Sequence, residues 1–204
     1  MSDLPSRLLI VTDRKLAQRP LEYVVAQALE GGARWIWFRD KDMSQTERRA
    51  LGEKLLRMCS DAGATLSVGG AAGEAAAMGA SAVHLPAGDD PCKARAMLGA
   101  QALIGVSTHS VAEAARIASL GADYVTLSPV YESASKPGYG PPLGASALSD
   151  ASRLAVPVVA LGGIDLKRVN PCLAAGAAAI AVMGALMSAS SVSTAVEAFM
   201  ARAA

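Results

Sequence analysis

Short runs of apolar residues recur along the chain, and the segments between them have the length of a helix. Each run holds about four residues, which suits strands that are buried on both faces of a parallel sheet. We therefore expect an alternation of strands and helices through the whole chain. The runs expected to form strands are Leu8–Val11, Trp35–Phe38, Thr65–Val68, Ala82–Leu85, Leu103–Val106, Tyr124–Leu127, Val158–Leu161 and Ala179–Val182.

Glycines and capping residues mark the expected helix ends. Ser44–Glu47 and Ser110–Glu113 have the form of capping boxes, and Asn170-Pro171 has the form of a cap followed by proline at the first helical position. Eight strand–helix units favour a closed (β/α)8 TIM barrel over an open doubly wound sheet, as a single domain over residues 1–204. A Gly-Ala pair that can close a helix precedes most of the strands, with glycine at positions Gly32, Gly63, Gly79, Gly99, Gly121 and Gly176.

Composition and charge narrow the range of partners. Of 204 residues, 52% are apolar, and a net charge of +1 with scattered Lys and Arg argues against binding to nucleic acid or a membrane surface. Three cysteines without metal-like spacing indicate reduced thiols, and the polar segment Met1 to Arg7 lacks a signal-peptide core. The most apolar run, residues 172–187, is shorter than the roughly 20 residues of a membrane helix. We expect a cytoplasmic protein, and a homo-oligomer is compatible with these features.

Two strand-to-glycine turns near the C-terminus suggest a phosphate site. Gly162 and Gly163 follow the run that ends at Leu161, and Gly184 follows the last run. Glycine lets backbone N–H groups approach an anion closely, and barrels of this class often bind phosphate after strands seven and eight. Asp165 can cap the next helical turn. The alternative is that the glycines serve only as tight turns.

The second strand continues into a segment with cationic side chains. Because side chains alternate along a strand, Trp37, Arg39 and Lys41 should point together into the mouth of the barrel, where an anionic ligand would satisfy the two cations. Ion pairs with Asp40 and Asp42 are the alternative.

The two histidines follow different patterns. His109 comes directly before the helix cap Ser110, and the positive end of a helix dipole favours a neutral imidazole that can act as base and then as acid. A surface histidine that supports the turn is the alternative. His84 lies between apolar residues, which favours a hydrogen-bonded core histidine. Asp89 could bind a metal ion, although Asp90 before Pro91 favours a plain helix start.

The longest connection runs from Ser128 to Gly144 and carries Ser133, Ser135 and Lys136. Two hydroxyls and a cation flanked by Gly and Pro suit a lid that closes over phosphate, and an irregular excursion is the alternative.

Taken in order, these segments resemble the thiamin-phosphate synthase/TenI family. The resemblance is carried by Val11-Thr-Asp13, Arg39-Asp-Lys41, Val83-His-Leu85, Gly105-x-Ser107-x-His109-Ser110, Ala122-Asp-Tyr124, Ser128-Pro-Val-Tyr131, Ser133-x-Ser135-Lys136 and Gly162-Gly-Ile164. It implies a (β/α)8 barrel that handles a thiazole phosphate. Its synthase members join that substrate to hydroxymethylpyrimidine diphosphate with Mg²⁺, whereas tautomerases of the TenI branch move a proton without a cofactor.

The resemblance also implies roles for single residues. Arg39 and Lys41 would face the diphosphate, Ser133, Ser135 and Lys136 would replace a Thr-x-Thr-Lys loop, and Gly162, Gly163 and Gly184 would hold the thiazole phosphate. His109 matches the acid/base histidine of the tautomerase branch.

Departures from the synthase pattern favour the TenI branch. Trp37 stands where the pattern has Gln, and Gly69-Gly70 replace Asn-Asp. One of two expected Mg²⁺ ligands is thereby absent, and the other would be Asp89. We therefore expect a cofactor-independent thiazole tautomerase, with the Mg²⁺-dependent synthase and a non-catalytic barrel that binds thiazole or thiamin phosphate as alternatives.

Overall fold

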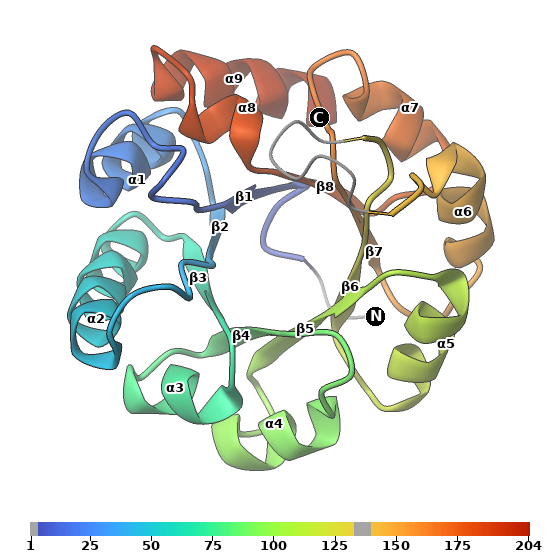
Figure 1. Ribbon diagram of the computed structural model, residues 1–204, viewed down its shortest axis with the longest axis horizontal. Coiled ribbons are helices and arrows are strands. Elements are labelled where there is room, and N and C mark those ends of the chain that lie inside the picture. Colours follow the sequence, from blue (N-terminus) through green and yellow to red (C-terminus); the bar gives the residue numbers. More distant parts are fainter. Residues whose placement is uncertain (1–3, 133–139) are drawn as a thin grey trace.

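The protein forms a closed barrel of parallel strands surrounded by helices, as the sequence predicts. The structure, a computed structural model, describes residues 4–132 and 140–204. Neighbouring strands pair in chain order, and β1 pairs with β8 to close the ring (Figure 1). The strands are β1 Leu8–Val11, β2 Trp35–Phe38, β3 Thr65–Gly69, β4 Ala82–Leu85, β5 Leu103–Thr108, β6 Tyr124–Leu127, β7 Val158–Leu161 and β8 Ala179–Val182.

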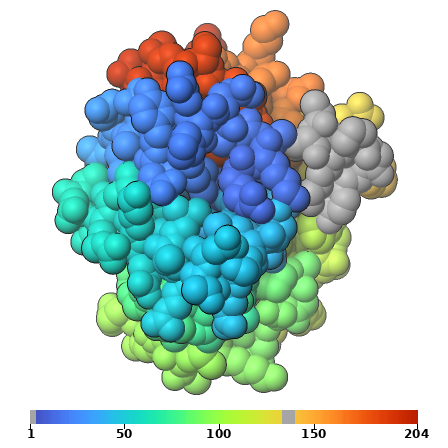
Figure 2. All heavy atoms as spheres, turned by 60° about the vertical axis from the view of Figure 1, so that its left-hand side comes forward, coloured from blue at the N-terminus to red at the C-terminus, as the bar shows by residue number. Residues whose placement is uncertain are grey.

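Helices follow the strands and cover the outside of the ring. Segments that follow one another in sequence lie side by side around it, so the colours change in order across the surface in Figure 2. No helix in the described part of the chain combines the length and the apolar character needed to cross a bilayer. The helices are α1 Leu21–Glu30, α2 Gln45–Asp61, α3 Ala72–Ala77, α4 Pro91–Leu98, α5 Val111–Ser119, α6 Gly144–Ala151, α7 Val169–Ala174, α8 Gly184–Met187 and α9 Val192–Ala203.

The predicted helix ends agree with the structure at most positions. Ser44 and Ser110 accept hydrogen bonds from the backbone N–H groups of Glu47 and Glu113, as capping boxes require. The prediction for Asn170-Pro171 is wrong, because α7 already begins at Val169. Asp165 accepts from the two N–H groups that precede α7, so the chain turns into the helix earlier. Each glycine of the predicted Gly-Ala pairs adopts a positive φ, namely Gly32, Gly63, Gly79, Gly99, Gly121 and Gly176.

Apolar side chains form two separate cores. The larger core lies between the strands and the helices. The smaller one fills the inside of the barrel and includes Leu9, Val11, Trp35, Trp37 and Tyr124.

Glycines in the strands make room for the large aromatic rings of the inner core. A Cβ on Gly105 would lie 2.0 Å from the ring of Tyr124 on the neighbouring strand β6. A Cβ on Gly69 would lie 2.3 Å from Nε1 of Trp37 on β2. The small barrel can therefore hold these rings only because both strands have glycine at these positions.

Candidate active site

A cavity of about 720 Å³ opens at the carboxyl ends of the strands. This is the end of a (β/α)8 barrel at which the loops after the strands build active sites, and the volume is in the usual range for small-molecule pockets. Most of the described site residues predicted from the sequence line this one cavity. The polar and glycine residues in its wall include Arg39, Lys41, Ser107, His109, Ser128, Gly162, Gly163, Arg168, Gly184 and Ser188.

The β2 sector of the cavity wall contains Trp37, Arg39 and Lys41, as side-chain alternation predicts. Arg39 Nη1 lies 3.7 Å from Asp13 Oδ2, and Asp42 pairs with Arg14 and Lys15. The predicted alternative, in which Arg39 and Lys41 form ion pairs with Asp40 and Asp42, is therefore wrong about the partners. Partial burial, followed by the charges of Arg39 and Arg48, lowers the pKa of the Lys41 amine.

Asp40, between the two cations, fixes the end of β2. Its carboxylate accepts hydrogen bonds from Thr12 Oγ1 and from the backbone N–H of Arg14, both at 2.6 Å. Its carbonyl oxygen accepts from Nε of the buried Arg48 at 2.7 Å. Arg48 also donates to the Gly69 carbonyl and to Glu74, so one guanidinium connects the ends of β2 and β3 with α3. The backbone that carries Arg39 and Lys41 is thus held from both sides.

The β7–β8 sector presents backbone amides to the cavity. Within residues 4–132 and 140–204, no acceptor is found for the backbone N–H groups of Gly163, Ile164, Gly184 and Ala185. All four residues line the cavity. Unpaired amides on two adjacent loops form a site suited to an anion such as phosphate.

The glycines of this sector also allow the loop after β6 to pack closely. Val130 and Tyr131 donate backbone hydrogen bonds to the carbonyl oxygens of Leu161 and Gly162. A Cβ on Gly163 would lie 2.2 Å from the carbonyl oxygen of Glu132. The glycines therefore also serve as a tight turn, as the alternative prediction states. This turn lets the loop after β6 pack closely and leaves the amides facing the cavity.

Arg168 is a cavity residue that the sequence reasoning missed. Its guanidinium donates to the Gly163 carbonyl, and its Cζ lies 4.6 Å from the centre of the Tyr131 ring. It therefore adds a positive charge beside the amides. Its position three residues after Asp165, in the turn that this aspartate caps, could have indicated a residue at the cavity.

His109 lies in the cavity wall after β5. Its Nδ1 lies 2.9 Å from the backbone oxygen of Ser128, and a carbonyl oxygen can only accept, so Nδ1 carries a proton. In the neutral ring, Nε2 is then the basic nitrogen. Ser107 and Ser128, which also line the cavity, were quoted in the sequence motifs without an assigned role.

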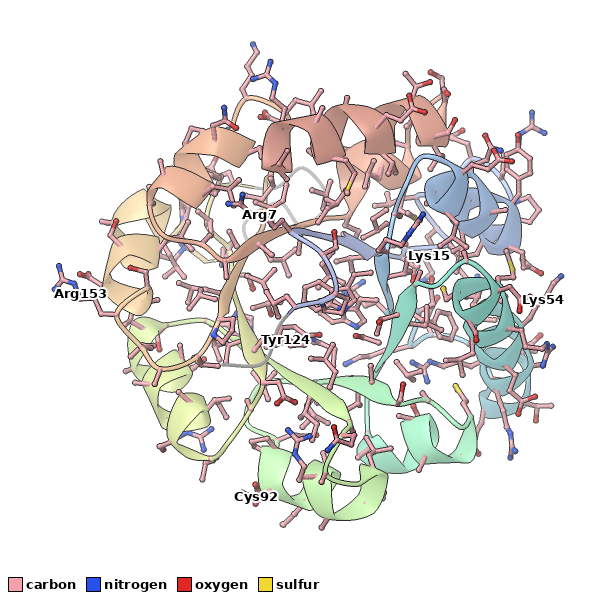
Figure 3. All side chains as sticks on the ribbon, turned by 180° about the vertical axis from the view of Figure 1, so that it is seen from behind. Arg7, Lys15, Lys54, Cys92, Tyr124 and Arg153 are labelled. Atoms are coloured by element: carbon pink, nitrogen blue, oxygen red, sulfur yellow. The ribbon has the colours of Figure 1, made fainter. Side chains whose placement is uncertain are left out.

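His84 is a hydrogen-bonded core residue, as predicted. It is 1% exposed, and its ring nitrogens lie 2.9 Å from Tyr124 Oη and 3.0 Å from Ser107 Oγ. The Trp37 indole packs against it with ring centres 3.8 Å apart. Figure 3 shows Tyr124, the hydrogen-bond partner of His84, inside the ring of strands, with Cys92 on the outer side.

Other predicted site residues lie elsewhere or cannot be placed. Ser133, Ser135 and Lys136 fall outside the described residues. Asp89 is exposed on the loop after β4 and is not part of the cavity wall, although its charge acts on Lys41.

The Mg²⁺ ligands expected from the synthase pattern are not brought together in the cavity wall. Protein sites for Mg²⁺ use one or two carboxylates together with substrate phosphates. Gly69 and Gly70 offer no side-chain oxygen at the end of β3, which leaves Asp89 as the acidic residue of the predicted set. Among the described residues, no group of three or more His, Cys, Asp and Glu side chains gathers at one point.

Comparisons with known proteins give a consistent family. A sequence model of the TMP-TENI family, described as thiamine monophosphate synthase, matches residues 8–186. The thiamine-phosphate synthase of Roseiflexus sp. (strain RS-1) is 37% identical over 183 residues, which are 88% of this chain and 78% of that protein. A putative thiamine-phosphate synthase of Geobacter sulfurreducens is 38% identical over 190 residues, covering 92% and 89% of the two chains.

Comparison with solved structures points to the same family. The thiamine phosphate pyrophosphorylase from Pyrococcus furiosus has a TM-score of 0.87 at 30% identity over 98% of both chains. A 3-hexulose-6-phosphate synthase, with a TM-score of 0.73 at 18% identity, shares the fold alone. These relatives do not specifically support the TenI branch that the sequence departures favoured. The chain belongs to the thiamine monophosphate synthase/TenI family, whose members take part in thiamine biosynthesis.

Proposed function

We propose that this protein joins hydroxymethylpyrimidine diphosphate to a thiazole phosphate to give thiamine phosphate. The observation that carries the proposal is that one cavity has two sectors suited to an anion. The amides of Gly163, Ile164, Gly184 and Ala185, for which no acceptor is found within residues 4–132 and 140–204, form one sector, and the cations Arg39 and Lys41 form the other. A reaction between two phosphorylated substrates needs both sectors at once. The names of the relatives support the same reaction.

The chemistry follows from these positions. The thiazole nitrogen forms a bond to the methylene carbon of the pyrimidine substrate, the bond from that carbon to oxygen breaks, and diphosphate leaves. Negative charge grows on the departing oxygen, where Arg39 and Lys41 would stabilise it. The amides of the β7–β8 sector would hold the thiazole phosphate and thereby orient its nitrogen. No step is assigned to Mg²⁺, because the ligands expected for it are not brought together in the cavity wall.

A second candidate reaction is the proton transfer of a thiazole tautomerase. It is favoured by Trp37, which lines the cavity where the synthase pattern has Gln and whose indole leaves no room for a side chain at position 69. This reaction requires one phosphorylated substrate and an acid/base group. His109, whose Nδ1 lies 2.9 Å from the Ser128 carbonyl oxygen, is the candidate for this group in the cavity wall.

One product assay separates the candidates. The protein is incubated with the thiazole phosphate tautomer alone, and then with the pyrimidine diphosphate added, with and without Mg²⁺, and products are identified by mass spectrometry and absorbance. We expect thiamine phosphate and diphosphate in the second incubation. Conversion of the thiazole alone, without thiamine phosphate, would replace the proposal with the tautomerase. Thermal stabilisation by the ligands without either product would support the non-catalytic barrel.

A further inference from the structure

A chain of buried polar groups leads from the middle of the barrel to the floor of the cavity. Tyr124 Oη lies 2.9 Å from His84 Nδ1, and His84 Nε2 lies 3.0 Å from Ser107 Oγ. Tyr124 is 0% exposed and His84 1% exposed, whereas Ser107 lines the cavity. The three side chains come from the adjacent strands β4, β5 and β6. Ser107 is thus the point at which this buried chain meets a bound ligand.

The direction of the hydrogen bonds follows from Tyr124. A buried phenol must donate its proton, and His84 Nδ1 is the acceptor found for it within the described residues. Nδ1 can accept only if it carries no proton. A neutral His84 therefore has its proton on Nε2.

The neighbouring contacts are compatible with this direction. Trp35 Nε1, which can only donate, donates to Ser67 Oγ at 3.0 Å, and the Ser67 hydroxyl keeps its own proton to donate. Ser67 also lowers the pKa of the Tyr124 phenol, against the larger effect of burial. Burial also keeps His84 neutral, because it lowers the pKa of the imidazole, with a smaller contribution from Lys41.

At the cavity end, His84 Nε2–H has Ser107 as its nearer acceptor. Thr126 Oγ1 lies at 3.4 Å, compared with 3.0 Å for Ser107 Oγ. A serine hydroxyl that accepts from Nε2–H has its own proton available for another acceptor.

We propose that Tyr124 holds His84 as the Nε2–H tautomer, and that His84 in turn makes Ser107 a hydrogen-bond donor into the cavity. His84 and Tyr124 are positioning residues, because they act on a ligand only through the Ser107 hydroxyl. An oxygen with negative charge is the ligand group that such a donor recognises. That this oxygen belongs to a diphosphate rests on the proposed function, whereas the tautomer of His84 does not.

The tautomer is measured directly by nuclear magnetic resonance. The sequence contains two histidines, so a long-range ¹H–¹⁵N spectrum of the ¹⁵N-labelled protein shows two imidazoles, and the variant His109→Asn assigns them. At pH 7 we expect His84 to show a protonated Nε2 and an unprotonated Nδ1. A protonated Nδ1, or an averaged mixture of both tautomers, would overturn the proposal. This outcome needs no substrate and no activity, so it is independent of the proposed function.

Variants then test the connection to the ligand. Tyr124→Phe removes the donor to Nδ1 at nearly constant shape, and we expect His84 to lose its single tautomer. Thr126→Val is the matched control, because Thr126 lies on the same strand as Tyr124 and only its more distant hydroxyl is removed. This variant should leave the tautomer unchanged. A tautomer that persists in Tyr124→Phe, or one that changes in Thr126→Val, contradicts the assignment.

Titration calorimetry with inorganic pyrophosphate gives the second readout. Ser107→Ala should weaken binding about tenfold, as expected for loss of one hydrogen bond to a charged group. Tyr124→Phe should weaken binding in the same direction, and the double variant should bind no more weakly than Ser107→Ala alone. Fully additive effects would show that Tyr124 does not act through Ser107. If pyrophosphate does not bind the wild-type protein, the diphosphate assignment fails while the tautomer measurement still stands.

Discussion

The indole of Trp37 occupies the space that a side chain at position 69 would need. Within the described residues, Trp37 Nε1 is a buried side-chain nitrogen for which no hydrogen-bond partner is found. An unpaired buried donor is unfavourable by about 1–3 kcal/mol, so packing against His84 and the rest of the inner core must offset it. Trp37 and Gly69 therefore form a matched pair in which one residue is large because the other has no side chain.

This pairing predicts a stability change at position 69. Gly69→Ala places a Cβ against Trp37 Nε1 and the Phe38 carbonyl, and we expect a loss of about 1–3 kcal/mol in the free energy of unfolding, measured by urea denaturation. The loss should be smaller in a Trp37→Leu background, since the indole is then gone. Gly73→Ala in α3 is the control, because its Cβ would have its nearest neighbour at 3.8 Å. Equal losses in both backgrounds would show that the two residues are not coupled.

His84 predicts a dependence of stability on acid. Burial, followed by the charge of Lys41, lowers the pKa of His84 from 6.5 to about 3. Between these values the unfolded chain binds a proton that the folded protein does not, so stability is lost as the pH falls below about 6.5. We expect His84 to contribute a slope of about 1.4 kcal/mol per pH unit between pH 6 and pH 5. Denaturation of the wild type and His84→Gln over this range checks it, and parallel curves would contradict it.

His109 predicts a difference between the two candidate reactions. If the protein is a tautomerase, His109→Ala should lower kcat by about 10²–10⁴, the usual contribution of a general acid/base group. If it is a synthase, phosphate binding by the β7–β8 amides and formation of thiamine phosphate should fall much less. Steady-state kinetics of His109→Ala with each substrate set distinguishes these outcomes. Unchanged kcat for tautomer conversion would remove His109 from that reaction.

At the scale of single elements, the strands could be predicted closely from the sequence. Strands buried on both faces are continuous apolar runs, so their positions are local information, and only β3 and β5 extend beyond the predicted ends. Helix starts were less certain, as α7 shows, because Asp165 and a backbone turn decided its start. Arg48 and Arg168 were not predicted as site residues, since their hydrogen bonds go to backbone oxygens, such as those of Gly69 and Gly163, which no residue pattern marks.

The two glycine turns of the β7–β8 sector should respond differently to substitution. Gly163 has a φ of 63° and no room for a Cβ, so Gly163→Ala should destabilise the protein by more than about 1 kcal/mol. A Cβ on Gly184 would have no neighbour within 4 Å, so Gly184→Ala should leave stability nearly unchanged. Thermal denaturation of both variants, without ligand, tests this contrast. Equal destabilisation would mean that the close approach of the β6 loop does not constrain position 163.

At the scale of the whole molecule, the barrel brings together loops that are far apart in the sequence. The sequence predicted the ring and therefore the end at which chemistry occurs, and most of the described candidate residues do line one cavity. The choice of reaction was not settled in this way. It depends on how Trp37 and the carboxylate that is absent at Gly70 change the cavity, and such effects are not additive over single motif positions.

The central claim is that one cavity binds two anionic groups at separate sectors. A crystal structure of the protein soaked with thiazole phosphate and inorganic pyrophosphate tests it most directly. We predict the thiazole phosphate on the amides of Gly163 and Gly184, and the pyrophosphate beside Arg39 and Lys41. Both anions on the same sector, or neither anion inside the barrel mouth, would contradict the account.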